Sequence, residues 1–191
     1  MPQSMNVLVT GAAGTVGNNV VGLAEAAGSR VIASDLTPKG GRQPVRGEVR
    51  AGDLRDRAFL DKLVRGVDAV VHTAALLDVG TPPGALDAVN AQAVENLYDA
   101  AARAGVSRFV HVSSAMIYAT RQGRPLDEDA RVAPRGPHGA SKLRGEDALR
   151  ARAERGGPAW TILRPAPLYG RRGRHPEASP LVVGPVMGMT W

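Results

Sequence analysis

A glycine-rich segment near the start of the chain, Thr10-Gly-Ala-Ala-Gly-Thr-Val-Gly17, directly follows the apolar run Val7 to Val9. A short continuous apolar run is typical of a parallel strand that is covered on both faces. Gly11 permits a turn that is closed to residues with a Cβ atom, Gly14 lets the backbone approach a ligand, and Gly17 lets a helix lie close to the strand. The segment therefore predicts a strand, a tight turn and a helix.

The start of the predicted helix, at Thr15 and Val16, presents free backbone N–H groups to this turn. Such groups bind anions, and the pyrophosphate of a dinucleotide is the expected ligand. A second apolar strand, Arg30 to Ser34, ends in Asp35, eighteen residues after Gly17. In dinucleotide-binding folds an acid at this distance holds the adenosine ribose, and its charge repels a 2′-phosphate. The spacing favours NAD over NADP, although an aspartate that only opens a loop gives the same pattern.

Predicted strands alternate with predicted helices over the rest of the chain. Further strands are expected at 48–51, 68–72, 108–112 and 159–163, and further helices at 57–65, 84–104 and 138–154. Each crossover is long enough for a βαβ unit, which predicts an α/β fold with a doubly wound parallel sheet in three layers. We expect a Rossmann-type dinucleotide-binding domain at 1–170. Residues 171–191 are expected to be an irregular tail at the start of a missing or truncated substrate lobe.

Composition excludes several kinds of function. The 191 residues include no cysteine, which excludes disulfides and thiolate metal sites, and the four histidines lack the spacing of a metal site. No long apolar segment and no signal-like run are present, so we expect a cytoplasmic protein without membrane contact. The net charge is +6, but the arginines are spread along the chain and aromatic residues make up only 4%. This pattern indicates a solvated surface rather than a nucleic-acid site. The densest basic group, Arg171 to His175, could contact an anionic substrate.

Ordered motifs along residues 5–170 resemble those of the extended short-chain dehydrogenase/reductase family, which includes sugar-nucleotide epimerases, dehydratases and hydroxysteroid dehydrogenases. Besides the glycine turn and Asp35, the motifs are Gly52-Asp53-Leu54, His72-Thr-Ala-Ala75, Asn90, Val112-Ser-Ser-Ala-Met-Ile-Tyr118, Gly139-Ala-Ser-Lys142 and Arg164-Pro-Ala-Pro-Leu-Tyr-Gly170. The resemblance implies an NAD-dependent oxidoreductase, epimerase or dehydratase that acts on an alcohol or sugar-type small molecule by hydride transfer. It also implies a homodimer that pairs through the helices carrying Asn90 and Lys142.

The same resemblance implies a role for each matching residue. The residues expected at the cofactor are Asp53 and Leu54 beside the adenine, Ala74 and Ala75 along the path to the nicotinamide, Asn90, and Pro165 and Lys142 at the nicotinamide and its ribose. Ser114 would hydrogen-bond the substrate oxygen that gains or loses a proton as hydride moves at carbon. Each also has a plain structural interpretation: Ser114 could cap a strand, and Asn90 could make a buried bond to a loop.

The sequence departs from the family pattern at His138, which lies four residues before Lys142, where the family carries its catalytic tyrosine. The two positions share one helix face. A histidine titrates near its ordinary pKa of about 6.5, and a cationic Lys142 favours the neutral ring, which suits a general base. Imidazole is shorter than a phenol, however, and a misplacement of about 1 Å can cost about 10²-fold in rate. Either His138 replaces the tyrosine as base, or the chain is a catalytically impaired NAD-binding regulatory or structural module.

Two further positions bear on the substrate and the base. Pro167 stands where many sugar-nucleotide members of the family carry an asparagine, so the resemblance supports nucleotide-sugar recognition less than it supports the fold. Tyr118 and Tyr169 could in principle supply a phenol, but their motif positions indicate pocket wall.

Overall fold

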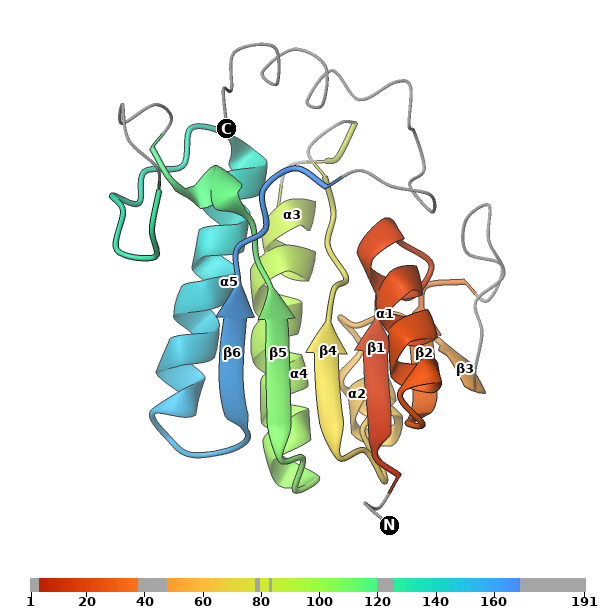
Figure 1. Cartoon of the computed structure of the whole chain (residues 1–191). Helices are drawn as coiled ribbons and strands as arrows, with labels where there is room; N and C mark the ends of the chain where they lie inside the picture. Colours follow the sequence, from red (N-terminus) through yellow and green to blue (C-terminus); the bar gives the residue numbers. More distant parts are fainter. Residues whose placement is uncertain (1–3, 38–47, 78–79, 83, 120–125, 169–191) are drawn as a thin grey trace.

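The computed structural model describes residues 4–37, 48–77, 80–82, 84–119 and 126–168. Six parallel strands form one sheet in the order β3-β2-β1-β4-β5-β6 (Figure 1). The strands are β1 (Asn6–Thr10), β2 (Arg30–Asp35), β3 (Glu48–Ala51), β4 (Ala69–His72), β5 (Arg108–Val112) and β6 (Ala159–Leu163). This order confirms the predicted doubly wound α/β fold. The predicted tail at 171–191, the basic group Arg171 to His175, and Tyr169 lie outside the described residues.

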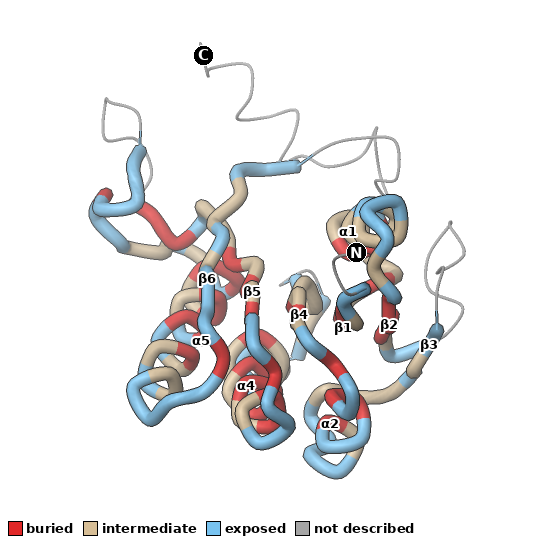
Figure 2. Tube along the Cα trace, turned by 60° about the horizontal axis from the view of Figure 1, so that its bottom comes forward, coloured by how far each residue is buried: buried red, intermediate tan, exposed pale blue. Residues whose placement is uncertain are grey.

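Helices cover both faces of the sheet. They are α1 (Thr15–Ala26), α2 (Arg57–Leu63), α3 (Ala85–Asp87), the π-helical turn η1 (Ala88–Gln92), α4 (Ala93–Arg103), the 3-10 turn η2 (Ala115–Ile117) and α5 (Pro137–Ala153). Helix α1 lies on one face, while α2, α4 and α5 lie side by side on the other (Figures 1 and 2). No helix in the described part of the chain is both long and apolar enough to cross a bilayer.

The core divides along the alternation of side chains in the strands. Val7 and Val9 of β1 pack towards α1, where Val21 is buried. Leu8, between them in the sequence, packs in the larger cluster on the opposite face together with Leu97 of α4. Because β1 is covered on both faces, its apolar residues are continuous, as the sequence predicted.

The helix predicted over 84–104 is interrupted in the structure by the π-helical turn η1. Helix α5 comes very close at this turn, since a Cβ atom on Gly145 would lie 2.2 Å from the Asn90 carbonyl oxygen. A sequence pattern of apolar residues carries no signal for such a one-residue shift in hydrogen bonding. The helix predicted at 57–65 ends at Leu63, and Asp56 caps its start by accepting hydrogen bonds from the Ala58 and Phe59 N–H groups.

Candidate functional site

The glycine turn after β1 is fixed by close backbone packing. Gly11 has a φ of 69°, in the left-handed region that favours glycine. A Cβ atom on Gly11 would lie 2.6 Å from the Ala74 nitrogen, and one on Gly17 would lie 2.3 Å from the Gly11 carbonyl oxygen. The start of α1 therefore lies directly against the turn, and the segment after β4 lies directly against both.

The first turn of α1 leaves its backbone donors open to a ligand. Gly14 is the N-cap residue and supplies no side-chain cap, and the first turn contains no acidic residue. The helical hydrogen bonds begin with the Asn18 N–H, which donates to the Gly14 carbonyl at 3.0 Å. The N–H groups of Thr15, Val16 and Gly17 precede that bond and have no acceptor within the helix. This donor set fits the pyrophosphate of a dinucleotide.

Asp35, at the end of β2, lies beside this turn. Its Oδ2 accepts a hydrogen bond from the Ala13 N–H at 2.9 Å, and its Oδ1 accepts one from the Leu36 N–H at 2.8 Å. The two hydrogen bonds thus hold the carboxylate at the edge of the candidate pyrophosphate site. This position fits the ribose-binding role that the spacing predicts.

Asp53 and Leu54, just beyond β3, lie at the outer end of the site. The hydrogen bond from the Arg55 guanidinium lowers the pKa of Asp53, and the two side chains form an ion pair. Leu54 is partly buried and packs against the larger core cluster. Their contact with an adenine stays a prediction.

Four more of the predicted residues follow the carboxyl ends of β4, β5 and β6. Ala74 and Ala75 come after β4, Ser114 after β5 and Pro165 after β6, so all lie at one edge of the parallel sheet (Figure 1). The Pro165 carbonyl accepts a hydrogen bond from the Ala115 N–H at 2.9 Å, and Ser114 Oγ caps η2 by accepting one from the Met116 N–H at 3.1 Å. The strand order reverses between β1 and β4, where doubly wound sheets bind their ligands.

His138 and Lys142 lie one turn apart at the start of α5, and both are buried, with exposed fractions of 7% and 2%. A Cβ atom on Gly139 would lie 2.5 Å from the Met116 carbonyl oxygen, so this first turn packs against η2, directly after Ser114. Burial lowers the pKa of Lys142 to about 8, although the charge of Glu146 acts in the opposite direction. The structure thus brings the three predicted catalytic residues onto adjoining elements.

Asn90 is fully buried, and its side chain is engaged by other parts of the chain. Its Oδ1 accepts a hydrogen bond from the Leu76 N–H at 2.8 Å, and its Nδ2 donates to the Leu76 carbonyl and to Ser141 Oγ, each at 2.9 Å. The structure therefore shows the buried bond to a loop that the sequence allowed. A contact between Asn90 and the cofactor stays a prediction.

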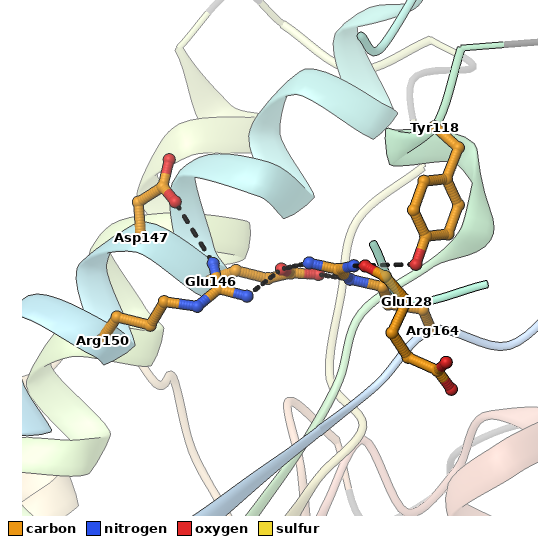
Figure 3. A network of polar contacts seen from close by, with 6 residues as sticks. All are labelled: Tyr118, Glu128, Glu146, Asp147, Arg150 and Arg164. Atoms are coloured by element: carbon orange, nitrogen blue, oxygen red, sulfur yellow. Dashed lines mark hydrogen bonds and ion pairs between the residues drawn. The ribbon is translucent and has the colours of Figure 1, made fainter. Parts of the chain in front are cut away.

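A buried ionic network that the sequence pattern missed lies further along α5 (Figure 3). The fully buried Glu146 carboxylate accepts hydrogen bonds from Arg164 Nε at 3.0 Å, Arg164 Nη2 at 2.7 Å and Arg150 Nη2 at 2.9 Å. Burial alone would raise the pKa of Glu146, but the hydrogen bonds from Arg164 and Arg150, together with the charge of Arg164, hold it below its ordinary value. Arg164 Nη1 also donates to Tyr118 Oη at 2.7 Å and to the Glu128 carbonyl at 3.1 Å.

Two buried histidines form a second feature, whose pairing the sequence did not predict. His72 of β4 and His111 of β5 are register partners, and their rings stack with centroids 5.3 Å apart. Burial lowers the pKa of His72 to about 3 and that of His111 well below its ordinary value, and the charge of Lys142 acts in the same direction. His72 Nδ1 lies 2.7 Å from Thr10 Oγ1, whereas neither ring nitrogen of His111 has a hydrogen-bond partner among the described residues. Both rings are therefore neutral.

Comparisons with known proteins identify the family of the chain. The sequence profile described as the NAD dependent epimerase/dehydratase family matches residues 7–184. The UDP-glucose 4-epimerase of Rhizobium leguminosarum bv. trifolii is 34% identical over 197 residues, which cover 95% of this chain and 60% of that protein. The low-salt glycan biosynthesis protein Agl12 of Haloferax volcanii is 33% identical over 185 residues, which cover 91% of this chain and 59% of that protein. The chain thus spans about three fifths of the length of these curated relatives.

Solved structures with the same fold contain NAD. The dTDP-glucose 4,6-dehydratase DesIV of Streptomyces venezuelae, with NAD and TYD bound, superposes with a TM-score of 0.82 at 31% identity, covering 96% of this chain and 62% of that chain. A short-chain dehydrogenase/reductase superfamily protein of Agrobacterium tumefaciens, with bound NAD, superposes with a TM-score of 0.73 at 38% identity, covering 83% of this chain and 48% of that chain.

Proposed function

Because the chain belongs to the NAD dependent epimerase/dehydratase family, we propose that it binds NAD and oxidises a hydroxyl group of a nucleotide-sugar substrate. The observation that carries the proposal is the arrangement at one edge of the sheet. There, the uncapped start of α1 lies next to Asp35, and the helix that carries the buried pair His138 and Lys142 packs with its first turn against η2, directly after Ser114. The group formed by α1 and Asp35 fits a dinucleotide, and the group formed by His138, Lys142 and Ser114 fits a proton transfer.

The residues at the start of the chain would hold the cofactor. The N–H groups of Thr15, Val16 and Gly17 would bind the pyrophosphate, because they lack an acceptor in the helix and no acidic side chain opposes an anion. The Asp35 carboxylate would bind the adenosine ribose hydroxyls and repel a 2′-phosphate. Ala74 and Pro165 would line the way to the nicotinamide, and Lys142 would hold the nicotinamide ribose.

The chemical step is assigned to three side chains. When bound, NAD would accept a hydride from the substrate carbon, which leaves the hydroxyl proton to be removed. His138 takes that proton as general base, through the lone pair of a neutral imidazole ring. Ser114 Oγ hydrogen-bonds the same oxygen as it becomes a carbonyl oxygen. Lys142, whose pKa burial lowers to about 8, keeps a positive charge at neutral pH and lies one helical turn after His138.

The substrate class is taken from the relatives. UDP-glucose 4-epimerase and dTDP-glucose 4,6-dehydratase carry names that specify a glucose linked to a nucleoside diphosphate. Oxidation of a hydroxyl group on such a sugar is the step that the residues described above could perform. UDP-glucose and dTDP-glucose are therefore the first substrates to test.

Calorimetric titration of the purified chain with NAD and NADP tests the cofactor site. We expect preferential binding of NAD, and a loss of about tenfold or more in affinity in Asp35→Ala, because charge-assisted hydrogen bonds contribute about 1.5–3 kcal/mol. Asp61→Ala, which removes a carboxylate paired with Arg103 on the surface, is the matched control and should leave affinity unchanged. Equal affinity for NAD and NADP, or no binding of either, would overturn the assignment of Asp35.

Turnover of UDP-glucose and dTDP-glucose, with the products identified by NMR, tests the assignment of His138. We expect His138→Gln to abolish turnover while NAD affinity is retained. The alternative function, an impaired NAD-binding module, is favoured by the presence of a histidine in place of the family's tyrosine. It predicts NAD binding without turnover in the unaltered chain and a gain of turnover in His138→Tyr.

We propose in addition that two copies associate through the helices that carry Asn90 and Lys142. A hollow of about 360 Å³ lies between these helices on the outer surface, and its walls combine small apolar residues with charged ones: Asp87, Ala88, Ala91, Gln92, Glu95, Arg144 and Ala148. Light scattering of the purified protein in solution should give the mass of a dimer, and the Ala91→Arg variant should give the mass of a monomer. A monomer in the unaltered chain would overturn the proposal.

A further inference from the structure

The backbone of Leu76, in the segment after β4, is fixed from two sides. The Asn90 side-chain amide binds both its N–H, at 2.8 Å, and its carbonyl oxygen, at 2.9 Å. Asn90 is itself fully buried and is held by Ser141, whose Oγ donates to the His138 carbonyl at 2.8 Å. The Leu76 carbonyl is therefore a rigid acceptor directly beside the start of α5.

His138 makes use of this acceptor. Its Nδ1 lies 2.9 Å from the Leu76 carbonyl oxygen. A carbonyl oxygen has no proton to donate, and it has two lone pairs, one for Asn90 and one for the ring. The hydrogen bond therefore requires that Nδ1 carries the proton. In a neutral imidazole only one nitrogen is protonated, so the lone pair lies on Nε2.

From this geometry we infer that Asn90, acting through the Leu76 carbonyl, holds His138 in the Nδ1–H tautomer and so directs its basic Nε2 towards the substrate. Asn90 is a positioning residue in this scheme, because it touches neither the substrate nor the reacting atoms. The inference rests on the proposed function in one respect, which is that His138 is the base. The tautomer itself is a property of the chain without any ligand.

The tautomer bears on the difficulty that a short imidazole poses. Nε2 is the ring nitrogen farther from the helix backbone, so placing the lone pair there gives His138 its longest reach. The opposite tautomer would put the lone pair on Nδ1 and set it against the lone pairs of the Leu76 carbonyl. Its only acceptor of a substrate proton would then be turned to the protein interior. In that opposite tautomer Nε2 already carries a proton, so it cannot accept one from a substrate.

Two-bond nitrogen–hydrogen NMR spectra of the 15N-labelled full chain, recorded above pH 7 without cofactor, report the tautomer directly. His138→Gln identifies the signals of His138 among the four histidines, because only those signals disappear. We expect the pattern of a protonated Nδ1 in the unaltered chain. A protonated Nε2, or rapid exchange between both forms, would overturn the inference without any use of a variant.

Asn90→Ala tests the role of Asn90, and a thermal melt shows that the variant is folded. We expect loss of the single tautomer and, where the chain turns over substrate, a fall in kcat of about 10- to 100-fold with a smaller change in KM. Asn96→Ala is the partly matched control, because Asn96 is a buried asparagine on α4 that accepts a hydrogen bond from Gln92. This variant should change neither the tautomer of His138 nor kcat. If Asn90→Ala keeps the Nδ1–H pattern, Asn90 does not set it.

The two assignments fail separately. A chain that shows the Nδ1–H tautomer, and loses it in Asn90→Ala, but does not turn over a nucleotide sugar supports the positioning by Asn90 and contradicts the proposed reaction. Turnover that depends on His138 but coincides with a protonated Nε2 supports the reaction and contradicts the positioning.

Discussion

Arg164 donates two hydrogen bonds to Glu146, from Nε at 3.0 Å and from Nη2 at 2.7 Å, and so joins the residue before Pro165 to the middle of α5 (Figure 3). The carboxylate is fully buried, and the arginine side chain is only 15% exposed. Pro165 is the predicted neighbour of the nicotinamide, and Lys142 lies one helical turn before Glu146. The ion pair therefore fixes the two sides of the candidate nicotinamide site relative to each other.

Replacing Arg164 should destabilise the fold strongly, because it leaves a buried carboxylate without its main partner. We expect Arg164→Ala to lower the free energy of unfolding by about 3–5 kcal/mol, measured by urea titration at pH 7. Arg150→Ala is the matched control: Arg150 binds the same carboxylate but is 39% exposed, so the loss should stay near 1 kcal/mol or below, as for surface pairs. Equal losses in the two variants would contradict the importance of burial.

The buried pair His72 and His111 should make the protein sensitive to acid. Unfolded histidines bind protons below pH about 6.5, whereas burial keeps folded His72 neutral down to about pH 3 and His111 well below its ordinary pKa. The unfolded state thus binds more protons in this window, so the free energy of unfolding falls as pH falls from 6.5, by up to about 1.4 kcal/mol per pH unit for each histidine.

His111→Phe isolates this effect from the titration of the carboxylates. We expect the variant to lose one histidine's share of the slope between pH 6.5 and 4. Its stability at pH 7 should be equal or higher, since neither ring nitrogen of His111 has a partner among the described residues. Urea titrations at several pH values measure both quantities. A slope unchanged from that of the parent chain would show that His111 is not buried in its neutral form.

The sequence predicted the architecture well because the apolar pattern dominates it. The run Val7 to Val9 lies in a strand covered on both faces, and Asp35 ends the next strand beside the glycine turn, as its spacing from Gly17 indicated. In the helix predicted at 57–65, Leu60, Leu63 and Val64 are buried and Phe59 is partly buried against the same core. Local pattern and capping chemistry were sufficient in these elements.

The candidate site was less predictable, because the side of α5 that is buried in it is polar. The buried side of α5 includes His138, Ser141, Lys142 and Glu146, which a search for apolar residues places in solvent. Their partners, such as Arg164, are distant in sequence, and no local rule connects them. The hydrogen bonds between Asn90 and Leu76 were not predictable either, because Asn90 lies in the π-helical turn η1, which the sequence pattern did not indicate. Only the family resemblance pointed to some of these positions, and it did not give their contacts.

Lys142 should make the protein more stable as the pH rises above neutrality. Its pKa is lowered to about 8 by burial, whereas the unfolded side chain has the ordinary value of 10.5. Between these values the unfolded state binds more protons than the folded state. The free energy of unfolding should therefore increase from pH 8 to 10, by at most about 1.4 kcal/mol per pH unit. Lys142→Met should remove this increase, and a rise of the same size in the variant would exclude Lys142 as its source.

Gly17 should be intolerant of even one methyl group, because both the fold and the candidate cofactor site depend on the distance between α1 and the turn after β1. In Gly17→Ala the new Cβ atom would lie 2.3 Å from the Gly11 carbonyl oxygen and 2.8 Å from Thr73 Oγ1, so α1 must move away. We expect a loss of about 1–3 kcal/mol in the free energy of unfolding. We also expect weaker NAD binding by calorimetry, because the N–H groups of the first turn move with the helix. Gly136→Ala is the control, since its φ is −125° and a Cβ atom there meets nothing within 4 Å. Unchanged stability and NAD affinity in Gly17→Ala would mean that α1 is free to shift, and that its first turn is not held in place for a pyrophosphate.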